Sequence, residues 1–136
     1  MAMKIAVLGA GAIGGLIAAY LKRKGKNVCL IGRPNQVEAI KRQGLRVSGK
    51  RGDICVELEV SESLKDRLDL IILSTKTQDI EEAYRQNRDF FAGSEILTTQ
   101  NGVRAEEILS RFVNRDNIVS SIVMFGATYL EPGYIV

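Results

Sequence analysis

Histidine is absent from the 136 residues, and cysteine is scarce, with two in the chain. Without histidine, the chain can supply neither a Ser-His-Asp or Cys-His catalytic system nor a His-ligated metal site. Cys29 and Cys55 are too few for a zinc site or a disulfide framework, so no metal site is predicted. Both lie in apolar, strand-like runs, which indicates two small buried thiols in a reducing compartment and favours a cytoplasmic protein.

A large charge of one sign is absent as well. The 19 lysines and arginines exceed the 16 aspartates and glutamates by three, too few to indicate a nucleic-acid or membrane partner. Ten of the basic residues lie within residues 22–51, where Glu38 is the one acid. This segment contains no aromatic side chain on which a base could stack. It favours a small anionic ligand, and no nucleic acid is expected as a partner.

Long hydrophobic runs are also rare, and the one uncharged run covers residues 5–21. Its 17 residues are at the lower limit for a membrane span and include four glycines, which are poor residues for a helix interior. Residues 5–8 are continuously apolar, as in a buried strand, whereas residues 13–21 have the apolar spacing of an amphipathic helix. The run therefore predicts a strand, a glycine turn and a helix, and neither a membrane segment nor a signal peptide.

The remaining chain, of ordinary globular composition, alternates between apolar runs and helical spacing. Strands are predicted at residues 5–8, 27–31, 68–73, 95–99 and 117–123, and helices at residues 13–21, 34–43, 80–91 and 103–112. This order predicts an α/β fold, a doubly wound Rossmann-type sheet, mostly parallel, with helices on both faces. Strict alternation around a turn at residues 49–53 predicts an additional antiparallel pair, residues 45–48 with residues 54–60.

The last residues predict a hairpin, residues 125–130 and 134–136, whose second strand has just begun. Because a domain seldom stops within an apolar strand, we expect residues 1–136 to be one N-terminal domain of a longer protein or a fragment of it. The alternative is a hairpin that closes a sheet edge.

A G-x-G-x-x-G motif joins the first predicted strand to the first predicted helix, as a dinucleotide-binding turn requires. The motif consists of Gly9, Ala10, Gly11, Ala12, Ile13 and Gly14. Gly9 permits the tight turn, Gly11 leaves room for a pyrophosphate, and Gly14 lets the helix pack closely on the strand. The alternative is a glycine-rich turn with a packing role alone.

The end of the second predicted strand indicates which cofactor would bind. A protein that binds NAD usually carries Asp or Glu there, whereas this chain has Arg33. A guanidinium can grip the 2′-phosphate of NADP, with no carboxylate nearby to compete, so NADPH/NADP+ is the predicted cofactor. Arg33 could otherwise be a solvated surface residue. The basic residues Arg42, Arg46, Lys50 and Arg51 could add to the field at this phosphate or form solvated faces.

Polar residues follow the next two buried strands, at the edge where open α/β sheets bind ligands. Lys76 could donate to the nicotinamide end or to an anionic substrate, or could pair with Asp79. Asn101 could contact a ligand or could be a loop residue of an Asn-Gly turn.

In order and spacing, these residues resemble those of the ketopantoate reductase (2-dehydropantoate 2-reductase) family. The matching segments are residues 4–15, Gly32-Arg33, Lys76-Thr77 with Glu81-Glu82-Ala83, Gln100-Asn101-Gly102, Phe125-Gly126-Ala127 and Pro132-Gly133. The resemblance implies NADPH-dependent reduction of a small 2-keto acid, typically ketopantoate to pantoate in pantothenate and coenzyme A biosynthesis. It implies that Arg33 meets the 2′-phosphate and that Lys76 and Asn101 lie near the nicotinamide and the substrate.

Two departures from the family pattern limit what is carried over. Gln78, a predicted cofactor contact, stands where the family often has an aromatic residue. The family's general-acid lysine belongs to a helical C-terminal domain that would follow Val136, so we expect this chain to bind NADPH with little turnover. Other NADPH-dependent hydroxyacid or opine-type dehydrogenases and a non-catalytic nucleotide-sensing module are the alternatives, and a homodimer is left open.

Overall fold

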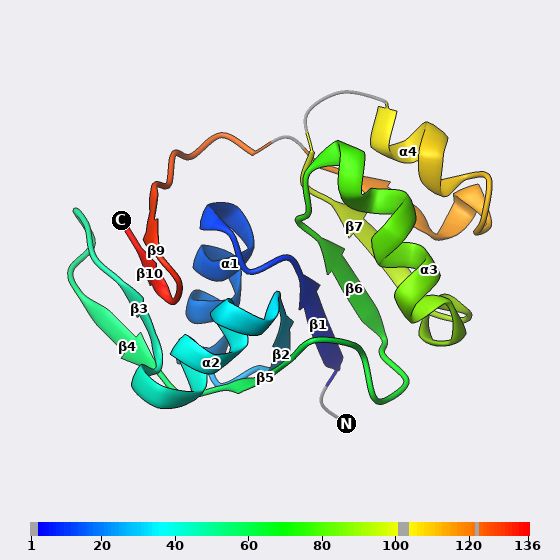
Figure 1. Cartoon of the computed structure of the whole chain (residues 1–136). Coiled ribbons are helices and arrows are strands. Elements are labelled where there is room, and N and C mark those ends of the chain that lie inside the picture. The colour runs from blue at the N-terminus through cyan, green and yellow to red at the C-terminus, as the bar shows by residue number, and fades with distance from the viewer. Residues whose placement is uncertain (1–2, 101–103, 122) are drawn as a thin grey trace.

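A computed structural model describes residues 3–100, 104–121 and 123–136. Its centre is a six-stranded sheet, ordered β5-β2-β1-β6-β7-β8, in which all neighbouring strands are parallel (Figure 1). The strands are β1 Lys4–Leu8, β2 Asn27–Ile31, β5 Glu59–Ser61, β6 Leu70–Leu73, β7 Glu95–Thr98 and β8 Ile118–Ser120. The predicted parallel sheet is confirmed.

Helices cover both faces of this sheet. The helices are α1 Ala12–Arg23, α2 Pro34–Gln43, α3 Ile80–Phe91 and α4 Arg104–Leu109, with 3-10 turns η1 Thr77–Asp79 and η2 Arg115–Asn117. Figure 1 shows α1 and α2 on one side of the sheet and α3 and α4 on the other. The strand order therefore reverses between β1 and β6, and such sheets bind ligands outside the carboxyl ends of the strands at this point.

Each face of the sheet has its own apolar core, because successive side chains of a strand point to opposite faces. On β1, Ile5 and Val7 join a core with α1 and α2, whereas Ala6 and Leu8 join a core with α3 and α4. Burial on both faces explains why the strand is continuously apolar. None of the described helices is both long and apolar enough to cross a membrane.

A second sheet of four strands, ordered β4-β3-β10-β9, packs on α1. Its strands are β3 Leu45–Val47, β4 Ile54–Val56, β9 Tyr129–Glu131 and β10 Tyr134–Ile135. The predicted antiparallel pair β3–β4 and a C-terminal hairpin are confirmed, but the first strand of the hairpin, β9, covers residues 129–131 and not the predicted 125–130. β10 pairs in parallel with β3, so the hairpin extends the small sheet, and its Ile135, 1% exposed, enters the core under α1.

The predicted single strand at residues 54–60 is wrong in its second half. β4 ends at Val56, and residues 59–61 form β5, which pairs in parallel with β2 at the edge of the central sheet. Val60 is 4% exposed there. Because a period of two fits any strand, the alternation could not reveal that the chain leaves one sheet and enters another.

α4 ends at Leu109, three residues before the predicted end, and Val103 lies outside the described residues. The Ser110 hydroxyl donates to the Glu107 carbonyl oxygen at 2.9 Å, and the Phe112 N–H donates to the Leu109 carbonyl at 2.9 Å. These bonds close the helix in tight turns, since a serine hydroxyl competes for helical carbonyls.

The prediction of two buried thiols is also wrong: Cys55 is exposed and Cys29 is half-buried. Cys55 lies on β4, the edge strand of the small sheet. Burial, with smaller contributions from Glu59 and Asp66, raises the pKa of the Cys29 thiol to about 11. This thiol is therefore neutral near pH 7 and a poor nucleophile.

Candidate functional site

The glycine turn follows β1, the strand that lies between β2 and β6 in the sheet. The order of the strands reverses at this place. Gly9 has φ of 109°, and its N–H donates to the Ile31 carbonyl oxygen at 2.9 Å. A Cβ atom at Gly9 would stand 2.9 Å from the backbone carbonyl carbon of Ser74, at the end of β6. Glycine is thus required here both by the left-handed conformation and by the close approach of β6.

The third glycine of the motif has a packing role. A Cβ atom at Gly14 would overlap the carbonyl oxygen of Gly9, and one at the following Gly15 would overlap the side chain of Ile135. Both glycines are buried on α1. They let α1 lie directly against the turn and the small sheet, so the N-terminus of the helix is held over the end of β1.

Gly11 differs from the other two glycines of the motif. Among the described residues, no heavy atom lies within 4 Å of the place where its Cβ would stand. Gly11 is the N-cap of α1, no described side chain caps the first turn, and that turn carries no acidic residue. The first turn of α1 therefore has N–H groups that no described side chain caps, and the space beside Gly11 is open. This arrangement fits the diphosphate of a dinucleotide.

Arg33 is held by its backbone at the start of α2. Its N–H donates to the Gln36 side-chain oxygen at 2.9 Å, while the Arg33 side chain is 77% exposed. The preceding Gly32 packs against the turn, because a Cβ there would come within 2.9 Å of the Ala10 Cβ. The guanidinium therefore projects from a fixed backbone beside the motif, where the ribose of a bound dinucleotide would lie.

A carboxylate does lie near Arg33, contrary to the expectation from the sequence. Asp79 Oδ2 is 3.7 Å from Arg33 Nη2. The expected alternative, a pair between Lys76 and Asp79, is not among the ion pairs of the described residues. Sequence reasoning missed the Arg33–Asp79 pair because the two residues are 46 positions apart and meet through the sheet.

The residues after β6 are arranged along the same edge. Lys76 precedes η1, its carbonyl oxygen accepts the Asp79 N–H at 2.9 Å, and the Lys76 and Gln78 side chains are exposed. Neither contacts the glycine turn through a hydrogen bond or ion pair in the part of the chain that is described. Asn101, the remaining predicted site residue, lies outside the described residues.

Two polar side chains beside Lys76 received no role from the sequence alone. Gln100 Nε2 donates to the Thr75 carbonyl oxygen at 2.6 Å, which ties the ends of β6 and β7 together. Within the described part of the chain, Thr75 Oγ1 and Gln100 Oε1 are buried without a hydrogen-bond partner. Thr75 and Gln100 both follow buried strands closely, and this position is the sequence signal that could have indicated a role for them.

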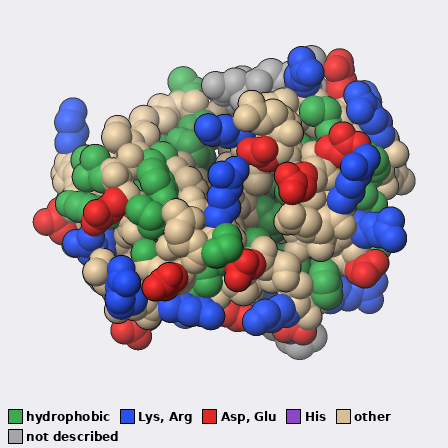
Figure 2. Space-filling view, viewed as in Figure 1, with side chains coloured by type: hydrophobic (Ala, Val, Ile, Leu, Met, Phe, Trp, Pro, Cys, Tyr) green, Lys and Arg blue, Asp and Glu red, His purple; other side chains and the backbone are tan. Residues whose placement is uncertain are grey.

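Two of the other basic residues that could add to the field at Arg33, Arg42 and Arg46, each pair with an acid of their own. Arg42 lies nine residues along α2, about 13 Å away, and pairs with Glu38 at 3.8 Å. Arg46 pairs with Glu131 at 3.0 Å and stacks on the Tyr134 ring at 4.3 Å. Figure 2 shows basic and acidic side chains interspersed over the visible face.

The family-level comparison agrees with this geometry. Residues 5–136 match the family model described as "Ketopantoate reductase PanE/ApbA". The chain belongs to the ketopantoate reductase family. A 2-dehydropantoate 2-reductase of Pyrococcus abyssi is 37% identical over 134 residues, and one of Lactococcus lactis is 32% identical over 137 residues. Each alignment covers at least 96% of this chain and 44% of the relative.

Solved structures that are similar to this chain belong to longer proteins, and the similarity covers about half of each. D-mandelate dehydrogenase, solved with NADH and anilino(oxo)acetate, has a TM-score of 0.91 and 33% identity, over 98% of this chain and 44% of that one. The 2-dehydropantoate 2-reductase of Porphyromonas gingivalis has a TM-score of 0.90 and 27% identity, over 99% and 51%. The chain thus spans about half the length of the proteins it matches.

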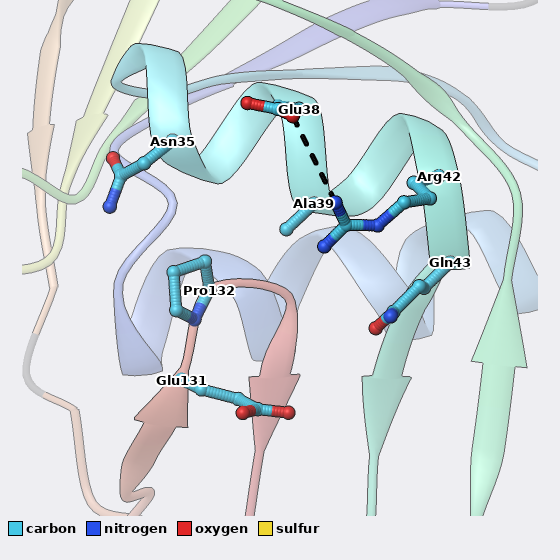
Figure 3. A pocket seen from close by; sticks show the side chains of 7 residues that line it. All are labelled: Asn35, Glu38, Ala39, Arg42, Gln43, Glu131 and Pro132. Carbon is cyan, nitrogen blue, oxygen red and sulfur yellow. Dashed lines mark ion pairs between the residues drawn. The ribbon is translucent and has the colours of Figure 1, made fainter.

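A hollow of about 240 Å³ lies outside the glycine turn, between α2 and the β9–β10 hairpin (Figure 3). Its lining consists of Asn35, Glu38, Ala39, Arg42, Gln43, Glu131 and Pro132. Figure 3 shows Arg42 turned toward Glu38, so its charge is already paired. Its lining includes no residue of the glycine turn and none of the residues that follow β6, so the hollow is not part of the candidate site.

Proposed function

We propose that this chain forms the NADPH-binding half of a reductase that acts on a small 2-keto acid. The observation that carries the proposal is the open space at Gly11, onto which the uncapped N-terminus of α1 opens. Arg33 stands beside it at the end of β2, where a 2′-phosphate would lie. Membership of the ketopantoate reductase family supports the same assignment.

Each group of residues in the site would contact a different part of the cofactor. The α1 N-terminus would hold the diphosphate, and Arg33 would hold the 2′-phosphate. Lys76, Gln78 and Asn101 would lie toward the nicotinamide, with the Lys76 ammonium and the Asn101 amide available to the carboxylate or carbonyl oxygen of the substrate. When bound, NADPH supplies the hydride for carbonyl reduction.

The proposed substrate of the whole protein is 2-dehydropantoate, reduced to pantoate in the cytoplasm for pantothenate and coenzyme A biosynthesis. The names of the relatives from Pyrococcus abyssi and Lactococcus lactis support this choice. Because the chain spans less than half of those relatives, we propose that it binds NADPH by itself and reduces 2-dehydropantoate slowly or not at all.

A second candidate is an NADH-dependent reductase of another 2-keto acid. Two observations favour it: the similarity to D-mandelate dehydrogenase solved with NADH, and the Asp79 carboxylate beside Arg33. A carboxylate paired with Arg33 would compete with a 2′-phosphate for the guanidinium. The cofactor preference therefore decides between the two candidates.

Calorimetric titration of the chain with NADPH and with NADH at low salt tests the proposal. We expect NADPH to bind about tenfold more tightly or better, on the order of the 1.5–3 kcal/mol of a charge-assisted contact. Arg33→Glu should abolish this preference, whereas Arg42→Glu, on the same helix but about 13 Å away, should retain it. Equal binding of both nucleotides by the wild type would favour the NADH candidate, and binding of neither would reject both.

A further inference from the structure

The ion pair between Arg33 and Asp79 crosses the candidate nucleotide site. Arg33 follows β2, whereas Asp79 lies beyond β6, and their side chains approach to 3.7 Å. β1 lies between β2 and β6 in the sheet, so the pair spans the carboxyl end of β1, where the glycine turn begins. The guanidinium that would bind an anionic ligand already faces an anion of the protein.

The two partners of this pair differ in exposure. Asp79 ends η1, its N–H donates to the Lys76 carbonyl oxygen at 2.9 Å, and its side chain is 32% exposed. The Arg33 side chain is 77% exposed and has no further hydrogen bond to the described residues. A separation of 3.7 Å is longer than a hydrogen bond, and such exposed pairs are weak. The pair is therefore easily broken, and the Arg33 guanidinium, the more exposed partner, can bind a phosphate in place of Asp79.

A phosphate bound by Arg33 would compete with Asp79 for the guanidinium. A phosphoryl group carries up to about two negative charges and three acceptor oxygens, so it can displace a single carboxylate. The phosphate must still take the guanidinium from Asp79, and this competition lowers the free energy gained from the contact. NADH has no 2′-phosphate, and its binding does not require Arg33 to leave Asp79.

We propose that Asp79 is a specificity-determining residue that lowers the preference for NADPH over NADH by competing with the 2′-phosphate for Arg33. The inference rests on the proposed function, because it needs a nicotinamide nucleotide at the glycine turn. Asp79 acts through Arg33 and is a positioning residue, not a catalytic one. Its effect is seen in the ratio of the two cofactor affinities, whereas a general effect on folding would change both affinities together.

A second ion pair provides a matched control. Arg115 Nη1 and Glu106 Oε1 are also 3.7 Å apart, with side chains 63% and 30% exposed. They pack near β8, at the edge of the sheet and three strands from β1. Glu106→Gln removes the same charge from a pair of the same separation and similar exposure, at a distance from the glycine turn.

The experiment compares dissociation constants for NADPH and NADH, measured by calorimetry on the whole chain at low salt. In Asp79→Asn we expect the NADPH preference to rise about two- to fivefold, the range for an exposed ion pair. Glu106→Gln should leave it unchanged within error. The rise should become smaller at about 0.5 M NaCl, because salt screens exposed charges. An unchanged or lower preference in Asp79→Asn would overturn the proposal.

A double-mutant cycle tests whether Asp79 acts through Arg33. In an Arg33→Gln background, Asp79→Asn should no longer change the preference. A rise in both backgrounds would contradict action through Arg33. If the wild type prefers NADPH through Arg33 and Asp79→Asn has no effect, the inference alone fails. If the wild type shows no preference and Arg33→Gln changes nothing, the proposed NADPH role of Arg33 fails, and the inference with it.

Folding of the variants is checked by urea unfolding. The Asp79 side chain makes no described capping bond with α3, so Asn should be tolerated. Asp79→Ser removes the same charge with a smaller side chain. It should show the same rise in preference, and it replaces Asp79→Asn if that variant does not fold.

Discussion

The carboxyl edge of the sheet is built differently on its two sides. At β1 and β2, the chain is shaped by missing side chains: a Cβ on Gly9, Gly14 or Gly32 would meet another atom within 3 Å. At β6 and β7, it is held by side chains that are present. The Thr99 hydroxyl donates to the Leu73 carbonyl oxygen at 3.2 Å, and the Gln100 amide donates to the Thr75 carbonyl oxygen at 2.6 Å.

This difference predicts how each side responds to substitution. A methyl group added at the glycine turn meets backbone atoms, which cannot move without shifting a strand or a helix. A side chain removed at the β6–β7 edge costs one hydrogen bond and leaves the backbone in place. A substitution should therefore lower the free energy of unfolding strongly on the β1–β2 side and only slightly on the β6–β7 side.

The largest effect is expected for Gly14→Ala. The added methyl would overlap the carbonyl oxygen of Gly9 and force α1 away from the turn, so we expect a loss of stability of about 3 kcal/mol or more. Urea unfolding measures this loss. Gly49→Ala is the control, because nothing lies within 4 Å of its added methyl. A stable Gly14→Ala protein would show that the turn is less tightly built than the structure indicates.

Gly11→Ala should separate binding from packing within the same motif. Its methyl points into open space, so the stability should fall by less than about 1 kcal/mol, the range for an N-cap change. The NADPH affinity should fall by about tenfold or more, because the methyl occupies the place proposed for the diphosphate. Calorimetry on the folded variant measures the affinity. Unchanged affinity would place the nucleotide elsewhere.

The smallest effect is expected on the second side, for Gln100→Met. The substitution keeps the volume but removes the bond to Thr75, so we expect a loss of about 1 kcal/mol in urea unfolding. The affinity for 2′,5′-ADP, which carries the phosphates of the adenosine half alone, should stay within a factor of about two. A loss as large as that of Gly14→Ala would remove the contrast between the two sides.

Local sequence signals predicted much of this fold. The helix predicted at residues 34–43 matches α2, and the one predicted at residues 80–91 matches α3. Both have apolar residues at helical spacing, and Pro34 and Gly44 mark the ends of α2. The strand–glycine turn–helix order at β1 and α1 was predicted for the same reason, because it depends on neighbouring residues.

Sequence spacing could not show which strands pair or which charges meet. Residues 54–60 divide between two sheets, and β10 joins β3 in parallel although their paired residues, such as Tyr134 and Arg46, are 88 positions apart. The roles of Lys76, Gln78 and Asn101 toward a cofactor stay predictions. The pair of Arg33 with Asp79 follows from the order β2-β1-β6, which no local pattern contains.

The sequence by itself determined that a strand, a glycine turn and a helix follow one another, because backbone conformation depends on adjacent residues. It also placed Arg33 at the end of the second strand. Only the tertiary structure decided that Gly14 packs while Gly11 faces open space, and that Asp79 faces Arg33. The surroundings of the two glycines and the Arg33–Asp79 pair depend on residues that are far apart in the chain. Strand order and packing bring such residues together, and the local sequence does not contain that information.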